Sequence, residues 1–397
     1  MVTDARTAMP TEQSILTLSQ WISPSYPVGS FTYSHGLEAL VNLQWLGNAD
    51  SLSEWLFNIL QHGAARTDAL FLAAAYKCNS DEALIEIAKQ AECDFRDLLS
   101  ISDEFAVLFT HGGATMQNAM VPLNLASPEG NVDYVNSGHW AKRSIKEAER
   151  YTNVNIAATS EEEDFKYFPA QDSWKFSDNS SYVHYTPNET IGGLCLRTLH
   201  KCEIPVVADY SSGILSEPID VSKFSLIYGG AQKNIGPSGL GFVIVKKDLL
   251  GNAQSITPNL LNYTLINEGE SMSNTPPTFA WYVAGKVFKW LKSMGGVEAI
   301  SIINNRKANK LYDYIDSSDF YSNNINIENR SIMNVPFLLG NEDLNDKFLE
   351  ASKEAGLLAL KGHRSVGGMR ASIYNGLPEE AVDALIEFMD VFKKEYS

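Results

Sequence analysis

From about residue 88 onward, short apolar runs rich in β-branched and aromatic residues alternate with segments of helical periodicity. The predicted strands cover residues 105–110, 132–135, 154–158, 181–185, 204–208, 224–228 and 241–245. Helical runs are predicted from residue 116, over 141–151 and over 192–200. Strands that alternate with helices are joined by crossovers, which place parallel strands side by side. The sequence therefore predicts an α/β fold with a mostly parallel sheet.

The C-terminal part of the chain has a different order of elements. A long helix is predicted to begin after Pro276-Pro277 and to end before Gly295. Beyond it we expect helix, strand (332–338), helix, strand (357–360), strand (370–374) and helix. This order predicts a large domain over 88–296 and a small α+β domain over 297–397.

Residues 1–87 are predicted to form an all-helical segment. Helices are expected over 15–22, 37–41, 53–61 and 69–76. The favoured interpretation is a helical cap or an interaction surface. Ser34-His35 and Glu38 have no further ligand at a matching spacing, so no metal site is expected.

Composition limits the classes of partner and the compartment. The net charge of −17 favours neither nucleic acid nor an anionic membrane as a partner. The four cysteines form no CxxC pair, which is typical of a reducing cytosol. No apolar run approaches the roughly 18 residues of a membrane span, and we expect a cytoplasmic protein.

Lys233 and Asp209 are the residues most suggestive of chemistry. Lys233 lies on a turn after the run 224–228, which we expect to break at Gly229-Gly230. Burial there favours a neutral amine, which can form a Schiff base with an aldehyde. Asp209 closes the run 204–208, where a carboxylate can keep a pyridine nitrogen protonated. The alternative is a surface lysine in a loop.

Other residues at predicted strand ends complete a possible pyridoxal-phosphate site. Ala114 and Thr115 begin a helix after two glycines, a position suited to a phosphate. Trp140 could stack on the ring, and Thr190 could bond the ring hydroxyl. The coincidence at one sheet edge carries the hypothesis, because ligands of open α/β sheets bind there. Taken singly, a Gly-Gly before a helix is common, and a core tryptophan is the more usual interpretation.

A late glycine-rich loop, residues 361–370, carries three further cations. They are His363, Arg364 and Arg370. Arginines bind phosphate or carboxylate groups in a bidentate manner. The loop is therefore a candidate for binding an anionic substrate, and the alternative is an ordinary basic surface loop.

From about residue 88 to the end, the chain closely resembles the phosphoserine aminotransferase family, fold-type I enzymes among the class V aminotransferases. The first matching stretches are 107–117 (VLFTHGGATMQ), 133–140 (DYVNSGHW), 184–190 (HYTPNET) and 208–212 (ADYSS). The later ones are 231–236 (AQKNIG), 274–278 (NTPPT), 330–334 (RSIMN) and 362–372 (GHRSVGGMRAS). Their number and order make the resemblance specific.

This resemblance implies a reaction, a cofactor and roles for individual residues. The implied reaction is pyridoxal 5′-phosphate-dependent transfer of the amino group of L-glutamate to 3-phosphohydroxypyruvate, a step of serine biosynthesis in a family also linked to pyridoxine biosynthesis. Lys233 would form the Schiff base and act as the base. The implied cofactor contacts are Ala114, Thr115, Trp140, Thr190, Asp209 and Gln232. Asn274 and Thr275 would reach the cofactor phosphate of a neighbouring subunit, which implies a homodimer. His363, Arg364 and Arg370 would bind the substrate phosphate.

The amino-terminal part departs from that family. The family begins with a segment whose Ser-His-Arg grips the substrate carboxylate, whereas here Ser34-His35 is followed by Gly36. Residues 23–38 (SPSYPVGSFTYSHGLE) instead resemble the amino-terminal signature of the urease accessory protein of the nickel-delivery complex. That likeness runs over about 13–87, so the chain resembles a fusion.

Three functions are consistent with the sequence. The favoured one is phosphoserine aminotransferase activity, weakened or lost without the carboxylate arginine. The first alternative is a urease-maturation protein that contacts other urease accessory proteins through residues 13–87. The second is another class V enzyme that acts on a different amino acid.

Overall fold

The computed structural model describes residues 47–62 and 81–397, apart from residues 198 and 201. The chain divides into two compact units, residues 1–79 and 80–397. In the first unit, α3 (Ala49–His62) confirms the helix predicted over 53–61. The other predicted helices of this segment, and the signature at 23–38, lie outside the described residues.

A seven-stranded sheet forms the centre of the second unit. Its strands are β1 (Phe105–His111), β2 (Asn131–Asn136), β3 (Asn153–Thr159), β4 (Ser180–Tyr185), β7 (Val206–Asp209), β8 (Leu226–Gly230) and β9 (Leu240–Lys246). Their order across the sheet is β1-β9-β8-β7-β4-β2-β3. β9 is antiparallel to both of its neighbours, and all other pairs in this sheet are parallel. The predicted α/β fold with a mostly parallel sheet is confirmed.

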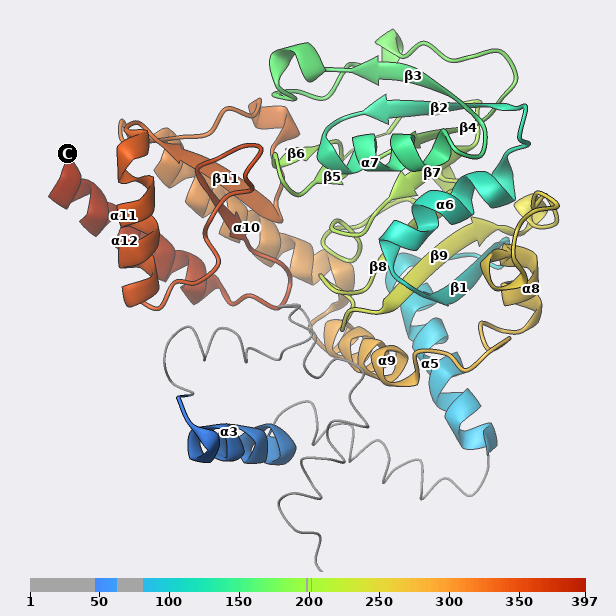
Figure 1. The fold of residues 1–397 in the computed structure, drawn as a ribbon, viewed down its shortest axis with the longest axis horizontal. Helices are drawn as coiled ribbons and strands as arrows, with labels where there is room; N and C mark the ends of the chain where they lie inside the picture. Colours follow the sequence, from blue (N-terminus) through green and yellow to red (C-terminus); the bar gives the residue numbers. More distant parts are fainter. Residues whose placement is uncertain (1–46, 63–80, 198, 201) are drawn as a thin grey trace, which may run out of the picture. The chain divides into compact units, whose positions relative to one another are not determined.

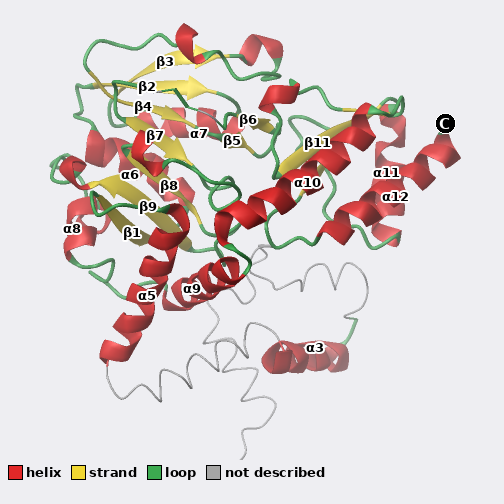
Figure 2. Ribbon diagram, turned by 180° about the vertical axis from the view of Figure 1, so that it is seen from behind, coloured by secondary structure: helices red, strands yellow, loops and turns green. Residues whose placement is uncertain are grey.

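Helices cover both faces of the sheet (Figure 1, Figure 2). On one face lie α6 (Ala114–Leu125), α7 (His139–Ala148) and α8 (Tyr263–Glu268), and on the other lie α5 (Asp81–Leu99) and α9 (Thr278–Ser293). The alternation of side chains along β1 shows why, since Val107 and Phe109 pack towards α5 and α9 while Ala106 and Leu108 pack towards α6.

Helix α5 is continuous through residues 87 and 88. Its Phe95 stacks on Phe288 of α9 with ring centroids 4.9 Å apart. Lys292 of α9 donates to Asp94 at 2.8 Å and to Asp97 at 2.7 Å. α5 is thus fixed to α9 by an apolar contact and by ion pairs.

The C-terminal elements form a second core beside the sheet (Figure 1). They are α10 (Gly296–Asp316), β10 (Tyr321–Ser322), β11 (Asn334–Leu339), α11 (Asn345–Glu354), β12 (Met369–Ser372) and α12 (Glu379–Tyr396). β11 pairs in antiparallel fashion with both β10 and β12. Lys307 of α10 is fully buried, and its ammonium donates to three backbone carbonyls, those of Ile373, Tyr374 and Leu377.

The helix predicted over 192–200 is wrong for residues 192–197. These residues form a turn and the second strand of a hairpin, β5 (Asn188–Glu189) with β6 (Leu194–Cys195). Gly193 has φ +75°, which no right-handed helix contains. A Cβ atom at Gly193 would lie 2.4 Å from the Pro336 side chain, so the glycine permits a close tertiary contact.

Two other strand predictions need correction. The break at Gly229-Gly230 is wrong, because β8 continues through both residues. A Cβ atom at Gly229 would lie 2.6 Å from the Phe242 ring, so this glycine serves close packing inside the sheet. The strand at 357–360 is also wrong, since Ala359 has φ 61° and only an isolated bridge joins Lys361 to Met369.

Over the stretches 47–62 and 81–397, leaving out 198 and 201, no helix has both the length and the apolar character needed to cross a membrane.

Candidate active site

The predicted site residues gather at the carboxyl edge of the sheet. Parallel pairing places the ends of β7 and β8 together, with Asp209 beside Tyr228. Asp209 is the last residue of β7, and Lys233 comes shortly after the end of β8. Pairing of His111 with Leu240 brings the end of β1 to the same edge. The fold therefore collects side chains that lie far apart in sequence.

Lys233 has no hydrogen-bond partner for its amine among the residues that the structure describes. Its Nζ lies 5.9 Å from the centroid of the Trp140 ring. Burial lowers the pKa of Lys233, the Asp209 and Glu189 carboxylates oppose this shift, and Arg370 adds to it. The amine is thus held partly buried over an aromatic face with its N–H donors uncommitted.

Only one of the two carboxylate oxygens of Asp209 accepts hydrogen bonds from the described residues. Its Oδ1 accepts hydrogen bonds from the backbone N–H of Ser211, at 2.9 Å, and from the Ser211 hydroxyl. Burial raises the pKa of Asp209, and the two Ser211 bonds and the Lys233 charge oppose that rise. Within the described part of the chain, Oδ2 has no hydrogen-bond partner. One carboxylate oxygen is therefore free to accept from a cationic donor.

Trp140 lies in the first turn of α7 and is held through its ring. Its Nε1–H donates to Thr190 Oγ1 at 2.8 Å. A hydroxyl that accepts one bond can still donate its own proton. Thr190 therefore both fixes the indole and retains a donor.

Glu189 is a residue of this site that the sequence analysis did not single out. Its side chain is fully buried, and its two oxygens accept the backbone N–H groups of Trp140, at 3.0 Å, and Ala141, at 2.8 Å. Burial raises the pKa of Glu189 to about 7, against the opposing effect of the two N–H groups. The only sequence signal was its place in the stretch 184–190, because its partners on α7 lie more than forty residues earlier.

Ala114 and Thr115 begin α6, directly after Gly112 and Gly113, which have φ values of 83° and 65°. No side chain caps this helix, so the first N–H groups have no partner within it. Such N–H groups favour an anion.

Three predicted cofactor contacts are exposed: Gln232, Asn274 and Thr275. Thr275 contributes its carbonyl oxygen to His111 Nε2 at 2.9 Å, which holds its loop near the end of β1. Among the described residues, no hydrogen bond joins the side chain of Gln232 or Asn274 to the Lys233 amine.

Two cationic residues of the late loop, Arg370 and His363, contact residues near the site. Arg370 Nη1 donates to the Thr190 carbonyl at 3.1 Å. The His363 ring lies 5.3 Å from that of His139 at the start of α7, and Arg364 is exposed nearby. Burial, followed by the His363 charge, lowers the pKa of His139. This crowding of cations is typical of a place that receives an anion.

Comparison with known proteins identifies the family. The model of class V aminotransferases matches residues 76–385. The chain belongs to the class V aminotransferase family. The curated phosphoserine aminotransferase of Hahella chejuensis is 55% identical over 309 residues, which are 78% of this chain and 86% of that protein. The corresponding protein of Ectopseudomonas mendocina is 54% identical over 319 residues, or 80% and 88% of the two chains.

Solved structures agree with this aminotransferase assignment. Phosphoserine aminotransferase from Bacillus circulans subsp. alkalophilus has a TM-score of 0.78 and 39% identity, covering 80% of this chain and 89% of that one. The pyridoxal-phosphate-bound enzyme from Trichomonas vaginalis has a TM-score of 0.74 and 36% identity, covering 81% and 96%. The predicted resemblance to this family is confirmed.

A second family model, UreF, matches residues 46–94 of this aminotransferase. It supports the predicted fusion, although the matched range begins after the signature at 23–38. The two matches overlap over residues 76–94, most of which belong to α5.

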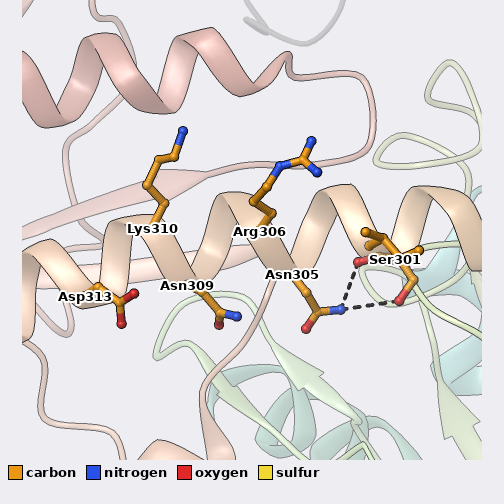
Figure 3. Close-up of a pocket in the computed structure, with 7 residues that line it drawn as sticks. Ser301, Asn305, Arg306, Asn309, Lys310 and Asp313 are labelled. Carbon is orange, nitrogen blue, oxygen red and sulfur yellow. Dashed lines mark hydrogen bonds between the residues drawn. The ribbon is translucent and has the colours of Figure 1, made fainter.

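A hollow of about 610 Å³ that shares no lining residue with this site opens along α10 (Figure 3). It is lined by Ser301, Ile302, Asn305, Arg306, Asn309, Lys310 and Asp313. Asn305 bonds back to Ser301, and Arg306 and Lys310 pair with Glu379. The polar groups of this hollow are thus largely paired with one another or with α12, unlike the Lys233 amine.

Proposed function

We propose that this class V aminotransferase uses pyridoxal 5′-phosphate to transfer the amino group of L-glutamate to 3-phosphohydroxypyruvate. The products are O-phospho-L-serine and 2-oxoglutarate, in serine biosynthesis. The observation that carries the proposal is the Lys233 amine, which lies over the Trp140 ring without a hydrogen-bond partner among the described residues. Beside it, Asp209 has one carboxylate oxygen free of hydrogen bonds to those residues. The names of the relatives support the choice of substrates.

The residues present fit the cofactor. Its phosphate matches the uncapped start of α6 at Ala114 and Thr115, and its ring nitrogen matches Asp209 Oδ2. Trp140 offers a stacking face, and Thr190 keeps a proton to donate to the ring hydroxyl. Gln232, Asn274 and Thr275 remain proposed contacts.

When bound, the cofactor supplies an electron-accepting ring that makes the Cα–H bond of an amino acid acidic. With the cofactor bound, Lys233 Nζ would be the base that takes the proton from the substrate Cα. Its lowered pKa keeps more of the amine in the neutral, proton-accepting form. Asp209 would hold a proton on the ring nitrogen, and Ser211 orients that carboxylate and opposes the rise in its pKa that burial causes.

We assign His363, Arg364 and Arg370 to the substrate phosphate. The substrate carboxylate lacks the family's Ser-His-Arg arginine, because Ser34-His35 is followed by Gly36. Loss of such a charge-assisted pair costs about 2–4 kcal/mol, or roughly 30- to 1000-fold in kcat/KM. We therefore expect cofactor binding with slow transamination.

We also propose a cytoplasmic homodimer with domains at 1–87, 88–296 and 297–397. The exposed Asn274 and Thr275 are free to reach a neighbouring subunit. Cys93, Cys195 and Cys202, the cysteines that the structure describes, are unpaired, in keeping with a reducing compartment. A role in urease maturation rests on the match over 46–94 and on the resemblance of residues 23–38, and it is not favoured.

The test is a visible absorption spectrum of the purified protein with pyridoxal phosphate, before and after addition of L-glutamate. We expect a new cofactor band that glutamate shifts. A band that glutamate leaves unchanged would show a cofactor site without a substrate clamp. No band would overturn the proposed function.

A further inference from the structure

We propose that Glu189 is a positioning residue that sets the plane of the Trp140 ring against the cofactor. The inference rests on the proposed function, because it concerns the residue that stacks on the cofactor ring.

The backbone of Trp140 is fixed by Glu189 in place of a local helix cap. α7 begins after Gly138, which has no side chain with which to cap the helix. The Glu189 carboxylate takes that role from the β5 hairpin and accepts both N–H groups of the first turn. A Cβ atom at Gly138 would lie 2.8 Å from Glu189 Cδ, so the glycine leaves the room that the carboxylate needs.

The ring of Trp140 is fixed by the next residue along the chain. Thr190 accepts the indole N–H, so residues 189 and 190 together hold the backbone and the ring. Asn188, just before them, donates to Ser212 at 2.7 Å and to Asn334 at 3.1 Å. The segment that positions Trp140 is therefore anchored to the turn after β7 and to β11 of the C-terminal core.

A carboxylate at this position is costly unless both of its oxygens are used. Among the described residues Glu189 forms no ion pair, and a buried charge without a cation is unfavourable. Glutamine would offer one acceptor oxygen, and its NH₂ group would face the second N–H. Only a carboxylate satisfies both N–H groups, which explains its presence beside Lys233.

The test is a double-mutant cycle on cofactor affinity. Apparent Kd for pyridoxal phosphate is measured by visible circular dichroism for wild type, Glu189→Gln, Trp140→Ala and the double variant. We expect Glu189→Gln to weaken binding about tenfold, the loss for one charge-assisted hydrogen bond. In the Trp140→Ala background the same change should alter the Kd less than about twofold, because the indole ring through which Glu189 acts on the cofactor is absent.

Glu161→Gln is the matched control. Glu161 is an exposed carboxylate that bonds Lys142 on α7 without touching Trp140, and its variant should keep wild-type affinity. Gly138→Ala is the second variant, because it keeps the charge of Glu189 but displaces its carboxylate. If Glu189→Gln does not fold, the same cycle with Gly138→Ala decides.

The outcomes separate the two proposals. Wild-type affinity in Glu189→Gln, or a full loss that persists in the Trp140→Ala background, would overturn the positioning role alone. A wild-type protein that binds no pyridoxal phosphate would overturn the proposed function, and this inference with it.

Discussion

Two lysines of this chain, Lys233 at the sheet edge and Lys307 in the C-terminal core, solve the problem of a buried amine in opposite ways. Lys307 is fully buried and donates to three backbone carbonyls. Lys233 is partly buried and, within the described residues, donates to none. Burial lowers the pKa of both, to about 8 for Lys307. The pKa shift alone therefore does not distinguish a structural lysine from a reactive one.

Hydrogen-bond satisfaction makes the distinction. A donor with three acceptors is a fixed part of the fold, and its removal leaves those acceptors unpaired. A donor with none costs stability where it stands, so its presence points to a ligand. Substitutions at both lysines, at a buried histidine and at Asp209 test this contrast, and the largest effect is expected at Lys233.

Lys233→Ala should abolish turnover, by at least about 10,000-fold, because it removes the amine that forms the Schiff base and carries the proton in the proposed reaction. Its thermal unfolding temperature should be unchanged or higher, since an unsatisfied amine is removed. Stopped-flow absorbance with L-glutamate and a thermal melt give the two numbers. Full activity in this variant would refute the site assignment.

Lys307→Met should have the reverse profile. We expect a loss of about 3 kcal/mol in the free energy of unfolding, because three carbonyls lose their donor. Cofactor binding by the folded protein should persist. Urea denaturation measures the loss, and Lys310→Met, one turn along α10 with surface ion pairs, should cost less than about 1 kcal/mol. Equal losses in the two variants would contradict the contrast.

His184 sharpens the contrast, because it is a buried base that is incompletely paired yet closed to ligands. Its Nε2 bonds the Tyr228 hydroxyl at 2.9 Å, its Nδ1 has no partner among the described residues, and burial lowers its pKa to about 3. The folded state therefore excludes a proton that the unfolded chain binds below its ordinary pKa of 6.5. Stability from this group is complete above that value and is lost as pH falls.

Between about pH 7.5 and pH 5, this linkage should remove about 2 kcal/mol of unfolding free energy. His184→Asn should abolish that part of the pH dependence, whatever its effect at neutral pH. His200→Asn, at an exposed histidine, is the matched control. Urea unfolding at the two pH values measures the difference, and an unchanged pH dependence in His184→Asn would show that this histidine is not kept neutral.

The smallest effect concerns the charge around Lys233. Asp209 raises the pKa of Lys233 against the effect of burial, so Asp209→Asn should lower that pKa further. Reductive attachment of a small aldehyde to Lys233, followed by peptide mapping across a pH series, should then reach its midpoint at lower pH. A midpoint that moves upward would mean that Asp209 does not act on this amine.

The sequence predicted the sheet well, because buried strands such as β9 contain a continuous apolar run, here 241–245. It failed where glycine has a packing role. Gly229 is predicted to end its strand, although it packs closely against the Phe242 ring inside β8. Gly193 was placed in a helix, although it turns a hairpin against Pro336. In both cases the deciding contact is with a residue distant in sequence.

The residues of the candidate site likewise divide into those that the sequence predicts and those that only the folded chain reveals. Lys233 and Asp209 were predictable, because strand order alone brings their ends together. Trp140 is predicted as a stacking residue, and its ring centroid lies 5.9 Å from Lys233 Nζ. Glu189 was not, since its function depends on two N–H groups of α7 that only the folded chain brings to it. Ser211 was missed for a smaller reason, since a serine two residues after an aspartate is common in turns.

Helix α5 has a consequence for how such a chain can arise and be re-engineered. It belongs to the aminotransferase match and largely to the UreF match, and it contacts the enzyme through Ala91, Phe95 and Leu99 on one face. The packing of a helix depends on which of its faces is apolar. An upstream segment can therefore be exchanged if it leaves Ala91, Phe95 and Leu99 on the same face of α5. The amino-terminal segment before α5 can therefore be replaced by an unrelated one without disturbing the sheet, as long as α5 keeps its buried face.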